Sequence, residues 1–79
     1  MLRINSSQQA GQILMTRRKA LGLSQASLAA RLGISQNRFS ELEAHAERLT
    51  LERLLALASQ LGLEVVLQEK TPPATHSEW

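Results

Sequence analysis

The sequence predicts a mainly α-helical domain of about four helices, followed by one short β-strand near the C-terminus. Three observations lead to this prediction. Four stretches between residues 6 and 62 carry apolar residues at helical spacing, and each begins after a serine or threonine that suits a helix N-cap. A glycine closes three of these stretches. Residues 63–69 then change to a period of two and contain two valines, a pattern that favours a strand.

The first helix is expected to begin at Ser6 or Ser7, after a short arm at residues 1–6. Gln9 is placed to complete a capping box, in which a side chain in the first turn reaches back to the start of the helix. Gly22 ends this helix. Its expected apolar face consists of Ala10, Ile13, Leu14 and Leu21.

Residues 24–43, SQASLAARLGISQNRFSELE, are the most informative part of the chain. Ser24 caps the second helix, and Gly33 supplies the positive φ with which the chain leaves that helix and turns sharply. Ile34 fills the turn, and Ser35 caps the third helix. The residues expected to face inward are Leu28, Ala29, Leu32, Phe39 and Leu42.

The outer face of the third helix is polar, and it consists of Gln36, Asn37, Arg38, Ser40 and Glu41. Such side chains reach base edges when a helix lies in the major groove of DNA. An ordinary pair of antiparallel helices fits the pattern of helix, glycine and helix as well. The register of residues 24–43 and the lack of the Glu/Lys pairs typical of a merely solvated helix favour a DNA-binding helix-turn-helix.

The charge distribution agrees with that interpretation. Residues 1–40 contain six basic residues and no acid, a net charge of +6, whereas residues 41–79 contain three basic and seven acidic residues, a net charge of −4. A basic half that carries the helix-turn-helix suits a phosphate backbone.

The fourth helix is expected after a short link from His45 to Leu49, with Thr50 as its N-cap and Gly62 as its stop. Leu57 lies off the expected stripe, either as a scattered surface residue or as part of a subunit interface. The stripe itself consists of Leu51, Leu54, Leu55, Ala58 and Leu61.

The predicted strand, residues 63–69, has no convincing partner elsewhere in the chain, since residues 2–4 are too short to serve. A lone strand leaves its N–H and C=O groups unpaired. The economical solution is the same strand of a second copy across a two-fold axis, which predicts a homodimer. The residues expected to make this dimer are Leu63, Val65, Val66 and Leu67.

Two parts of the chain are therefore expected: a domain at residues 1–70 and a flexible tail at residues 71–79. The tail has two prolines and ends on Trp79, the only tryptophan. Because Trp is a frequent interface anchor, Trp79 is expected to bind a partner protein. The alternatives are that Trp79 simply ends the tail, or that the tail is a degradation signal.

Composition excludes several classes of protein. There is no cysteine, which excludes a disulfide scaffold and a Cys-based zinc finger. The two histidines, His45 and His76, lie far apart, and no catalytic constellation or glycine-rich phosphate loop is present, so we expect no enzyme, no cofactor and no metal site. No apolar run has membrane length and no signal peptide is evident, which makes the expected location cytoplasmic.

Residues 9–62 resemble the Xre/Cro family of regulators, which share the fold of the phage lambda repressor. The matching motifs are RRKALGLSQ at 17–25, LAARLGIS at 28–35, the helix at 36–43 and LERLLALASQLGL at 51–63. The resemblance implies a lambda-repressor-like fold that binds a double-stranded operator as a dimer. It implies that Gln25 contacts a phosphate and that Arg18 pairs with Glu43. The expected DNA-binding residues are Gln25, Ser35, Gln36, Asn37, Arg38, Ser40, Glu41, Arg17 and Arg48.

The C-terminal strand followed by a tail that ends in Glu-Trp is similar to HipB-type antitoxins. That resemblance implies an autorepressor that binds its own promoter and neutralises a HipA-type serine/threonine kinase toxin. Two residues depart from the family pattern, since Phe39 replaces a β-branched residue and Ser27 replaces an acid. The alternatives are a stand-alone or phage-type repressor without a toxin, and a protein-interaction adaptor that does not bind DNA.

Overall fold

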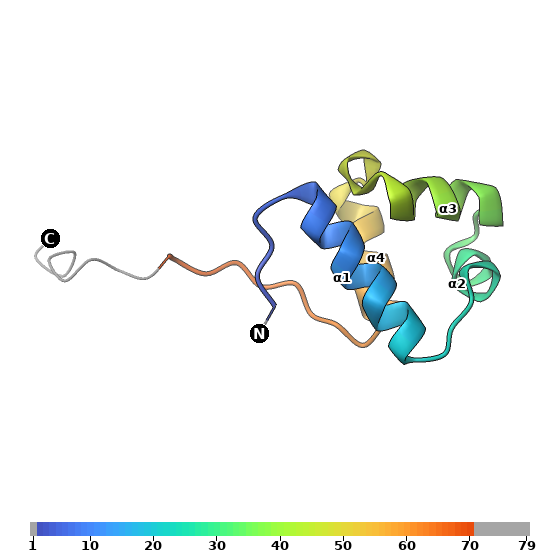
Figure 1. Ribbon diagram of the computed structural model, residues 1–79, viewed down its shortest axis with the longest axis horizontal. Helices are drawn as coiled ribbons and strands as arrows, with labels where there is room; N and C mark the ends of the chain where they lie inside the picture. Colours follow the sequence, from blue (N-terminus) through green and yellow to red (C-terminus); the bar gives the residue numbers. More distant parts are fainter. Residues whose placement is uncertain (1, 71–79) are drawn as a thin grey trace, which may run out of the picture.

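Residues 2–70 are described by a computed structural model, and they form four α-helices and one short 3₁₀ helix. The elements follow one another as α1 (Ser7–Ala20), α2 (Gln25–Leu32), α3 (Gln36–Ala44), η1 (Ala46–Arg48) and α4 (Leu51–Gln60). In Figure 1, α1 crosses in front of α4, while α2 and α3 lie together at one end. The four helices confirm the helical part of the predicted fold.

Each α-helix begins at the residue that the sequence indicates. The N-caps are Ser6, Ser24, Ser35 and Thr50, and the side-chain oxygen of each accepts a hydrogen bond from the backbone N–H three residues on. At the first helix the predicted back-bond is displaced by one residue, because Gln9 Oε1 accepts from the N–H of Asn5 at 2.6 Å. These bonds satisfy N–H groups that otherwise lack an intrahelical partner.

The turn between α2 and α3 has the predicted geometry. Gly33 has φ 72°, a left-handed conformation that side chains with a Cβ rarely adopt. Its N–H bonds to the carbonyl of Ala30, and the N–H of Ile34 bonds to that of Ala29. These two bonds satisfy the last carbonyls of α2 and fix the direction in which α3 begins.

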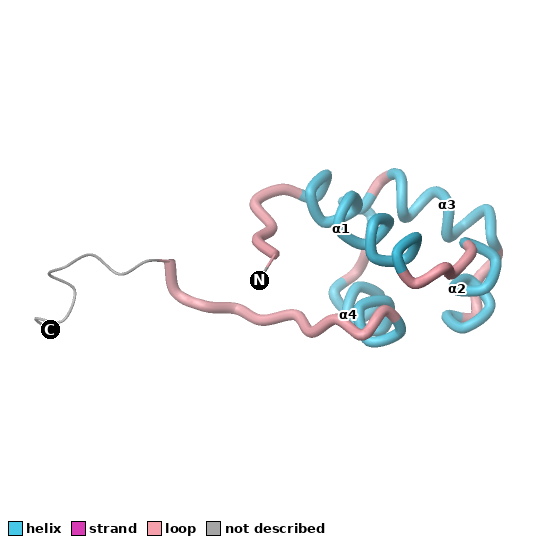
Figure 2. Tube along the Cα trace, turned by 60° about the horizontal axis from the view of Figure 1, so that its bottom comes forward, coloured by secondary structure: helices cyan, strands magenta, loops and turns pink. Residues whose placement is uncertain are grey.

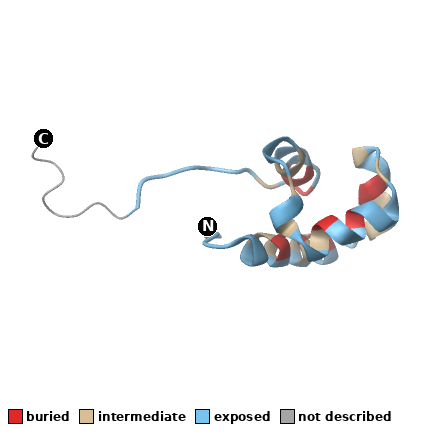
Figure 3. Ribbon diagram, turned by 90° about the horizontal axis from the view of Figure 1, so that it is seen from above, coloured by how far each residue is buried: buried red, intermediate tan, exposed pale blue. Residues whose placement is uncertain are grey.

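The core lies where the four helices converge, and Figure 3 shows the buried positions gathered on their inner faces. Leu28 and Leu61 are the largest residues that are fully buried. Leu23, Leu32, Ile34 and three further apolar residues pack around this core from its rim. The core consists of Leu14, Leu28, Ala29, Phe39, Leu57 and Leu61.

The predicted stripe of α4 is partly wrong. Leu57, expected at the surface, is only 4% exposed, whereas Leu51 and Leu55 are 68% and 47% exposed. The buried residues of this face are Leu57, Ala58 and Leu61, of which Ala58 and Leu61 belong to the predicted stripe. At 100° per residue, Leu51 and Leu55 lie at the edge of this face. The i, i+3, i+4 rule alone fits both the predicted stripe and the face that is actually buried.

Leu21 is a smaller correction, since it is 43% exposed rather than part of the apolar face of α1. It caps the helix at its C-terminal end, beyond the last turn that packs on the core. Gly11 is buried on that face instead. A Cβ at Gly11 would lie 3.0 Å from the carbonyl oxygen of Glu43 and 3.3 Å from Ala46 Cβ, so α1 approaches the end of α3 closely.

Residues 63–70 have no regular secondary structure, and no β-strand occurs between residues 2 and 70. Figure 2 shows this segment as a long loop that leaves the helical body. The predicted strand is therefore not formed within the single chain. The physical reason is that a strand needs a hydrogen-bonding neighbour, and residues 2–70 offer none. The tail at 71–79, with His76 and Trp79, lies outside the described residues.

Candidate DNA-binding surface

The outer face of α3 is a continuous polar surface. Phe39 and Leu42 are 2% and 5% exposed and attach the helix to the core. The predicted reading residues all lie outward and exposed: Gln36, Asn37, Arg38, Ser40 and Glu41. The face is long enough to contact several adjacent bases, because α3 has nine residues with a rise of about 1.5 Å each.

Two polar side chains of this face interact weakly with each other. Arg38 Nη1 lies 3.7 Å from Glu41 Oε1, and both side chains are about half exposed. Such a surface ion pair contributes little to stability and is readily exchanged. Arg38 therefore remains available for a guanine or a phosphate, and Glu41 for the amino group of a cytosine.

The N-terminus of α3 offers polar groups of a second kind. The hydroxyl of Ser35 accepts a hydrogen bond from the N–H of Arg38 at 3.1 Å, and Ser35 is exposed. The positive end of a helix attracts a phosphate. Here the polar side chains and the helix end lie on the same side of the molecule.

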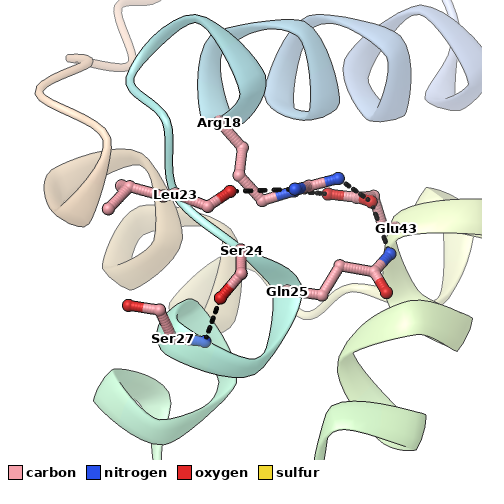
Figure 4. A network of polar contacts seen from close by, with 6 residues as sticks. All are labelled: Arg18, Leu23, Ser24, Gln25, Ser27 and Glu43. Atoms are coloured by element: carbon pink, nitrogen blue, oxygen red, sulfur yellow. Dashed lines mark hydrogen bonds and ion pairs between the residues drawn. The ribbon is translucent and has the colours of Figure 1, made fainter.

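A buried ion pair holds α3 in place against α1, as Figure 4 shows. Arg18 Nε and Nη2 donate to the two carboxylate oxygens of Glu43 at 2.8 and 3.0 Å, and Nη1 donates to the carbonyl of Leu23 at 2.9 Å. The two side chains are only 9% and 6% exposed. The predicted pairing of Arg18 with Glu43 is confirmed. A two-pronged contact of this kind fixes orientation as well as distance.

The same carboxylate holds Gln25 in the first turn of α2. Gln25 Nε2 donates to Glu43 Oε1 at 2.8 Å (Figure 4). An amide nitrogen has two protons, so Gln25 retains one N–H for a ligand. Sequence analysis missed this bond, because Gln25 and Glu43 are 18 residues apart and no local pattern links them. The bond holds the N-terminal end of α2 beside Glu43 of α3.

The two arginines expected at the DNA backbone occupy different places. Arg48 is exposed on η1, directly after α3. Arg17 lies on the α4 side of α1, where its Nε donates to the carbonyl of Leu61 at 2.9 Å. The structure thus brings Arg48, but not Arg17, next to α3. The bond from Arg17 was not predicted, because nothing local to either residue signals it.

Arg53 makes a similar long-range bond. Its Nη1 donates to the carbonyl of Leu32 at 3.1 Å and so ties α4 to the C-terminal end of α2.

The close approach of α1 to the end of α3 at Gly11 was also missed, although the sequence carried a signal for it. An isolated glycine inside a helical pattern often marks a close approach of two backbones.

A family model described as Helix-turn-helix (HTH_3) matches residues 14–67, which is more than half of the chain. The chain belongs to this Xre/Cro-like helix-turn-helix family, whose members are DNA-binding transcription regulators. The match covers the core, α2, the turn and α3. Neither the curated proteins nor the solved structures contain a match to the chain. Among residues 2–70, no helix is long and apolar enough to cross a membrane.

Proposed function

We propose that this protein is a sequence-specific antitoxin and autorepressor of a HipBA-type toxin–antitoxin operon. One observation carries the DNA-binding part of this proposal. The exposed polar face of α3 lies beside the end of α2, and the Arg18–Glu43–Gln25 network fixes the two helices relative to each other. Such preorganisation reduces the ordering cost of binding.

The proposed contacts divide into bases and phosphates. Gln36, Asn37 and Arg38 read base edges in the major groove. Ser40 and Glu41 lie next to them on α3 and contact the same or adjacent bases. The phosphate contacts of the proposal come from Gln25, Ser35, Arg48 and Arg17.

Dimerisation belongs to the same proposal, with residues 63–69 of two copies pairing as a two-stranded sheet. Val65, Val66 and Leu67 are exposed in the single chain, and their backbone groups have no ladder partner within residues 2–70. A two-fold dimer presents two recognition helices to half-sites about one helical turn of DNA apart. Pairing would therefore give residues 63–69 a hydrogen-bonding partner and would also double the number of DNA contacts.

The toxin partner is the most specific part of the proposal. It rests on the similarity of residues 63–79 to the C-terminal region of HipB-type antitoxins. The proposed partner is a serine/threonine kinase of the HipA type, and Trp79 is its proposed anchor. A large aromatic ring at the end of a polar segment concentrates binding energy in one place.

DNA binding is tested by selecting operators from a random duplex library and comparing variants on the best sequence. Asn37→Ala should lose about 1–3 kcal/mol of discrimination at one base pair. Ser59→Ala, on the exposed side of α4, is the matched control. If Asn37→Ala matches the wild type on every base variant, Asn37 is removed from the reading set. If the wild-type protein selects no sequence at all, the protein-interaction adaptor is favoured.

The toxin partner is tested with the full-length chain and the proteins encoded by the genes that neighbour its own, among which a HipA-type kinase is expected. We expect a stable complex, loss of kinase activity, and a blue shift of Trp79 fluorescence on a partner engineered to lack tryptophan. Deleting residues 71–79 should weaken that complex and leave operator affinity nearly unchanged. A protein that binds its operator but no neighbouring kinase would be a stand-alone repressor. An unshifted spectrum in a saturated complex, together with full affinity of the shortened chain, excludes Trp79 as an anchor.

A further inference from the structure

Two recesses open on the surface of the helical domain, and they differ in charge. One has a volume of about 580 Å³ and, among the described residues, is lined by Glu43 and Glu47 and by no basic side chain. It includes Gln25 and Ser40, so it belongs to the candidate DNA-binding surface. The other, which we call the α2–α4 recess, lies between the C-terminal end of α2 and one flank of α4 and has a volume of about 510 Å³. Both helices line it, chiefly through Arg31, Leu32, Arg53, Ala56, Ser59 and Gln60.

The positive charge of the α2–α4 recess comes from two helices. Arg31 is exposed in the last turn of α2, and Arg53 is half-buried on α4. Arg53 Nη1 donates to the carbonyl of Leu32 at 3.1 Å, which fixes the guanidinium beside the end of α2. Its other edge, Nε and Nη2, makes no hydrogen bond within residues 2–70, and neither arginine forms an ion pair there. Two guanidiniums without a carboxylate partner therefore line one recess.

The other polar groups of the recess lie along α4. Thr50, the N-cap of α4, lines one end, where the positive end of the helix favours an anion. Glu52 also lines the recess but forms no ion pair within residues 2–70. Arg53, Ala56 and Gln60 follow at i, i+3 and i+7, so they share one side of the helix. Because Ala56 is small, it leaves space between two long side chains.

The chemistry of these groups favours a phosphate monoester over other anions. A monoester carries a charge of about −1.5 to −2 at pH 7 and offers three acceptor oxygens, which suits two guanidiniums from different helices. A carboxylate or a phosphodiester carries only one negative charge. The recess is larger than a phosphate group and falls within the range of about 300–1,000 Å³ typical of small-molecule sites. Ser59 and Gln60 offer hydrogen-bonding groups for the remainder of such a ligand.

We propose that the α2–α4 recess binds a small phosphomonoester, with the phosphate on Arg31 and Arg53 and its polar remainder toward Ser59 and Gln60. None of the residues that line the recess belongs to the proposed DNA contacts. In Figure 2, α3 lies at the top of the helical body and α4 at the bottom. The bound ligand bridges α2, the first helix of the helix-turn-helix, and α4, and so stabilises the folded domain. Such a site depends on neither the dimer nor the toxin.

The test titrates the full-length protein with methyl phosphate at constant ionic strength and follows the arginine Nε–H signals by NMR. Methyl phosphate is a monoester, whereas dimethyl phosphate is a singly charged diester that resembles the DNA backbone. We expect saturable shifts of the Arg31 and Arg53 signals with methyl phosphate. Dimethyl phosphate should bind about tenfold more weakly, because it lacks one charge and one terminal oxygen.

Four variants separate a specific site from general attraction of anions. Arg31→Gln should raise the dissociation constant of methyl phosphate by about tenfold, because one charge-assisted contact is lost. Glu52→Gln should lower it, since a repelling carboxylate is removed. Ala56→Leu, at an exposed position, fills the recess without a change of charge and should weaken binding. The matched control, Lys19→Gln, removes an exposed charge of α1 and should leave binding unchanged.

Circular dichroism establishes that each variant is folded, and the titrations then decide the proposal. Weaker binding in Arg31→Gln and Ala56→Leu, tighter binding in Glu52→Gln and no change in Lys19→Gln would establish the site. An absence of shifts at both arginines, or an equal loss in Lys19→Gln, overturns it. Equal binding of methyl and dimethyl phosphate assigns the arginines to a singly charged group such as the DNA backbone and likewise overturns it.

Discussion

The helix-turn-helix at residues 24–44 and the C-terminal part at residues 51–70 treat their apolar residues in opposite ways. The first buries Leu28, Phe39 and Leu42 and leaves no large apolar side chain exposed. The second buries Leu57 and leaves Leu51 and four other large apolar residues exposed. The first region buries its large apolar residues within one chain, whereas the second leaves several of them exposed. In the proposed function, the first region reads DNA and the second pairs two copies of the chain.

The first prediction tests how much the buried Arg18–Glu43 ion pair contributes to the stability of the helix-turn-helix. Arg18→Ala leaves the carboxylate of Glu43 buried without its main partner, and breaking a buried pair costs about 3–5 kcal/mol. Urea unfolding should show this loss. The control is the double variant Arg18→Met, Glu43→Leu, which removes both charges and should recover much of the stability. A small loss for Arg18→Ala would mean that the pair is not the element that holds α1 to α3.

The second prediction compares two leucines of the same helix. Leu57→Ala should destabilise the domain by about 2–5 kcal/mol, because it opens a cavity in the core. Leu55→Ala, two residues away, should change the stability of the monomer by about 0.5 kcal/mol or less, since its side chain is about half exposed. Thermal or urea unfolding at a concentration below the dimer range measures both. Equal losses would contradict the observed phase of α4.

These two leucines also show where sequence reasoning stops. Helix caps and the glycine turn are local, so Ser24, Gly33 and Ser35 were predicted correctly from a few neighbouring residues. The phase of α4 was not, because Leu54, Leu55, Leu57 and Leu61 fit two overlapping stripes, and only packing against the other helices chooses between them.

The candidate site divides in the same manner. The outward face of α3 follows from periodicity alone, and the pairing of Arg18 with Glu43 followed from a family resemblance. The bond from Gln25 to Glu43 and the one from Arg17 to Leu61 join residues 18 and 44 positions apart. No local rule predicts such bonds, because they depend on where whole helices come to lie.

The third prediction tests the C-terminal part through its backbone. Val66→Pro removes one N–H and fixes φ, so it should weaken strand pairing between copies. An unsatisfied backbone group costs about 1–3 kcal/mol, which corresponds to about 5-fold to 150-fold in the dimer dissociation constant. Lys70→Pro, beyond the predicted strand, is the control. If Val66→Pro remains fully dimeric at low micromolar concentration in sedimentation experiments, the dimer does not depend on this segment.

The smallest expected effect concerns the two arginines expected at phosphates, and it is measured by the salt dependence of operator affinity. Arg48 is exposed directly after α3, so Arg48→Ala should weaken binding to all sequences and reduce the salt slope by about one.

Arg17 donates a hydrogen bond from its guanidinium to the carbonyl of Leu61, at the point where the chain leaves α4 for residues 63–70. We expect Arg17→Ala to change the salt slope less than Arg48→Ala and to lower the thermal stability of the free protein more. Lys19→Ala, which removes an exposed charge two residues further along α1, is the control for net charge. If Arg17→Ala flattens the salt dependence as much as Arg48→Ala does, Arg17 contacts the DNA backbone too. DNA binding would then extend beyond the helix-turn-helix to the surface of α1 that faces the end of α4.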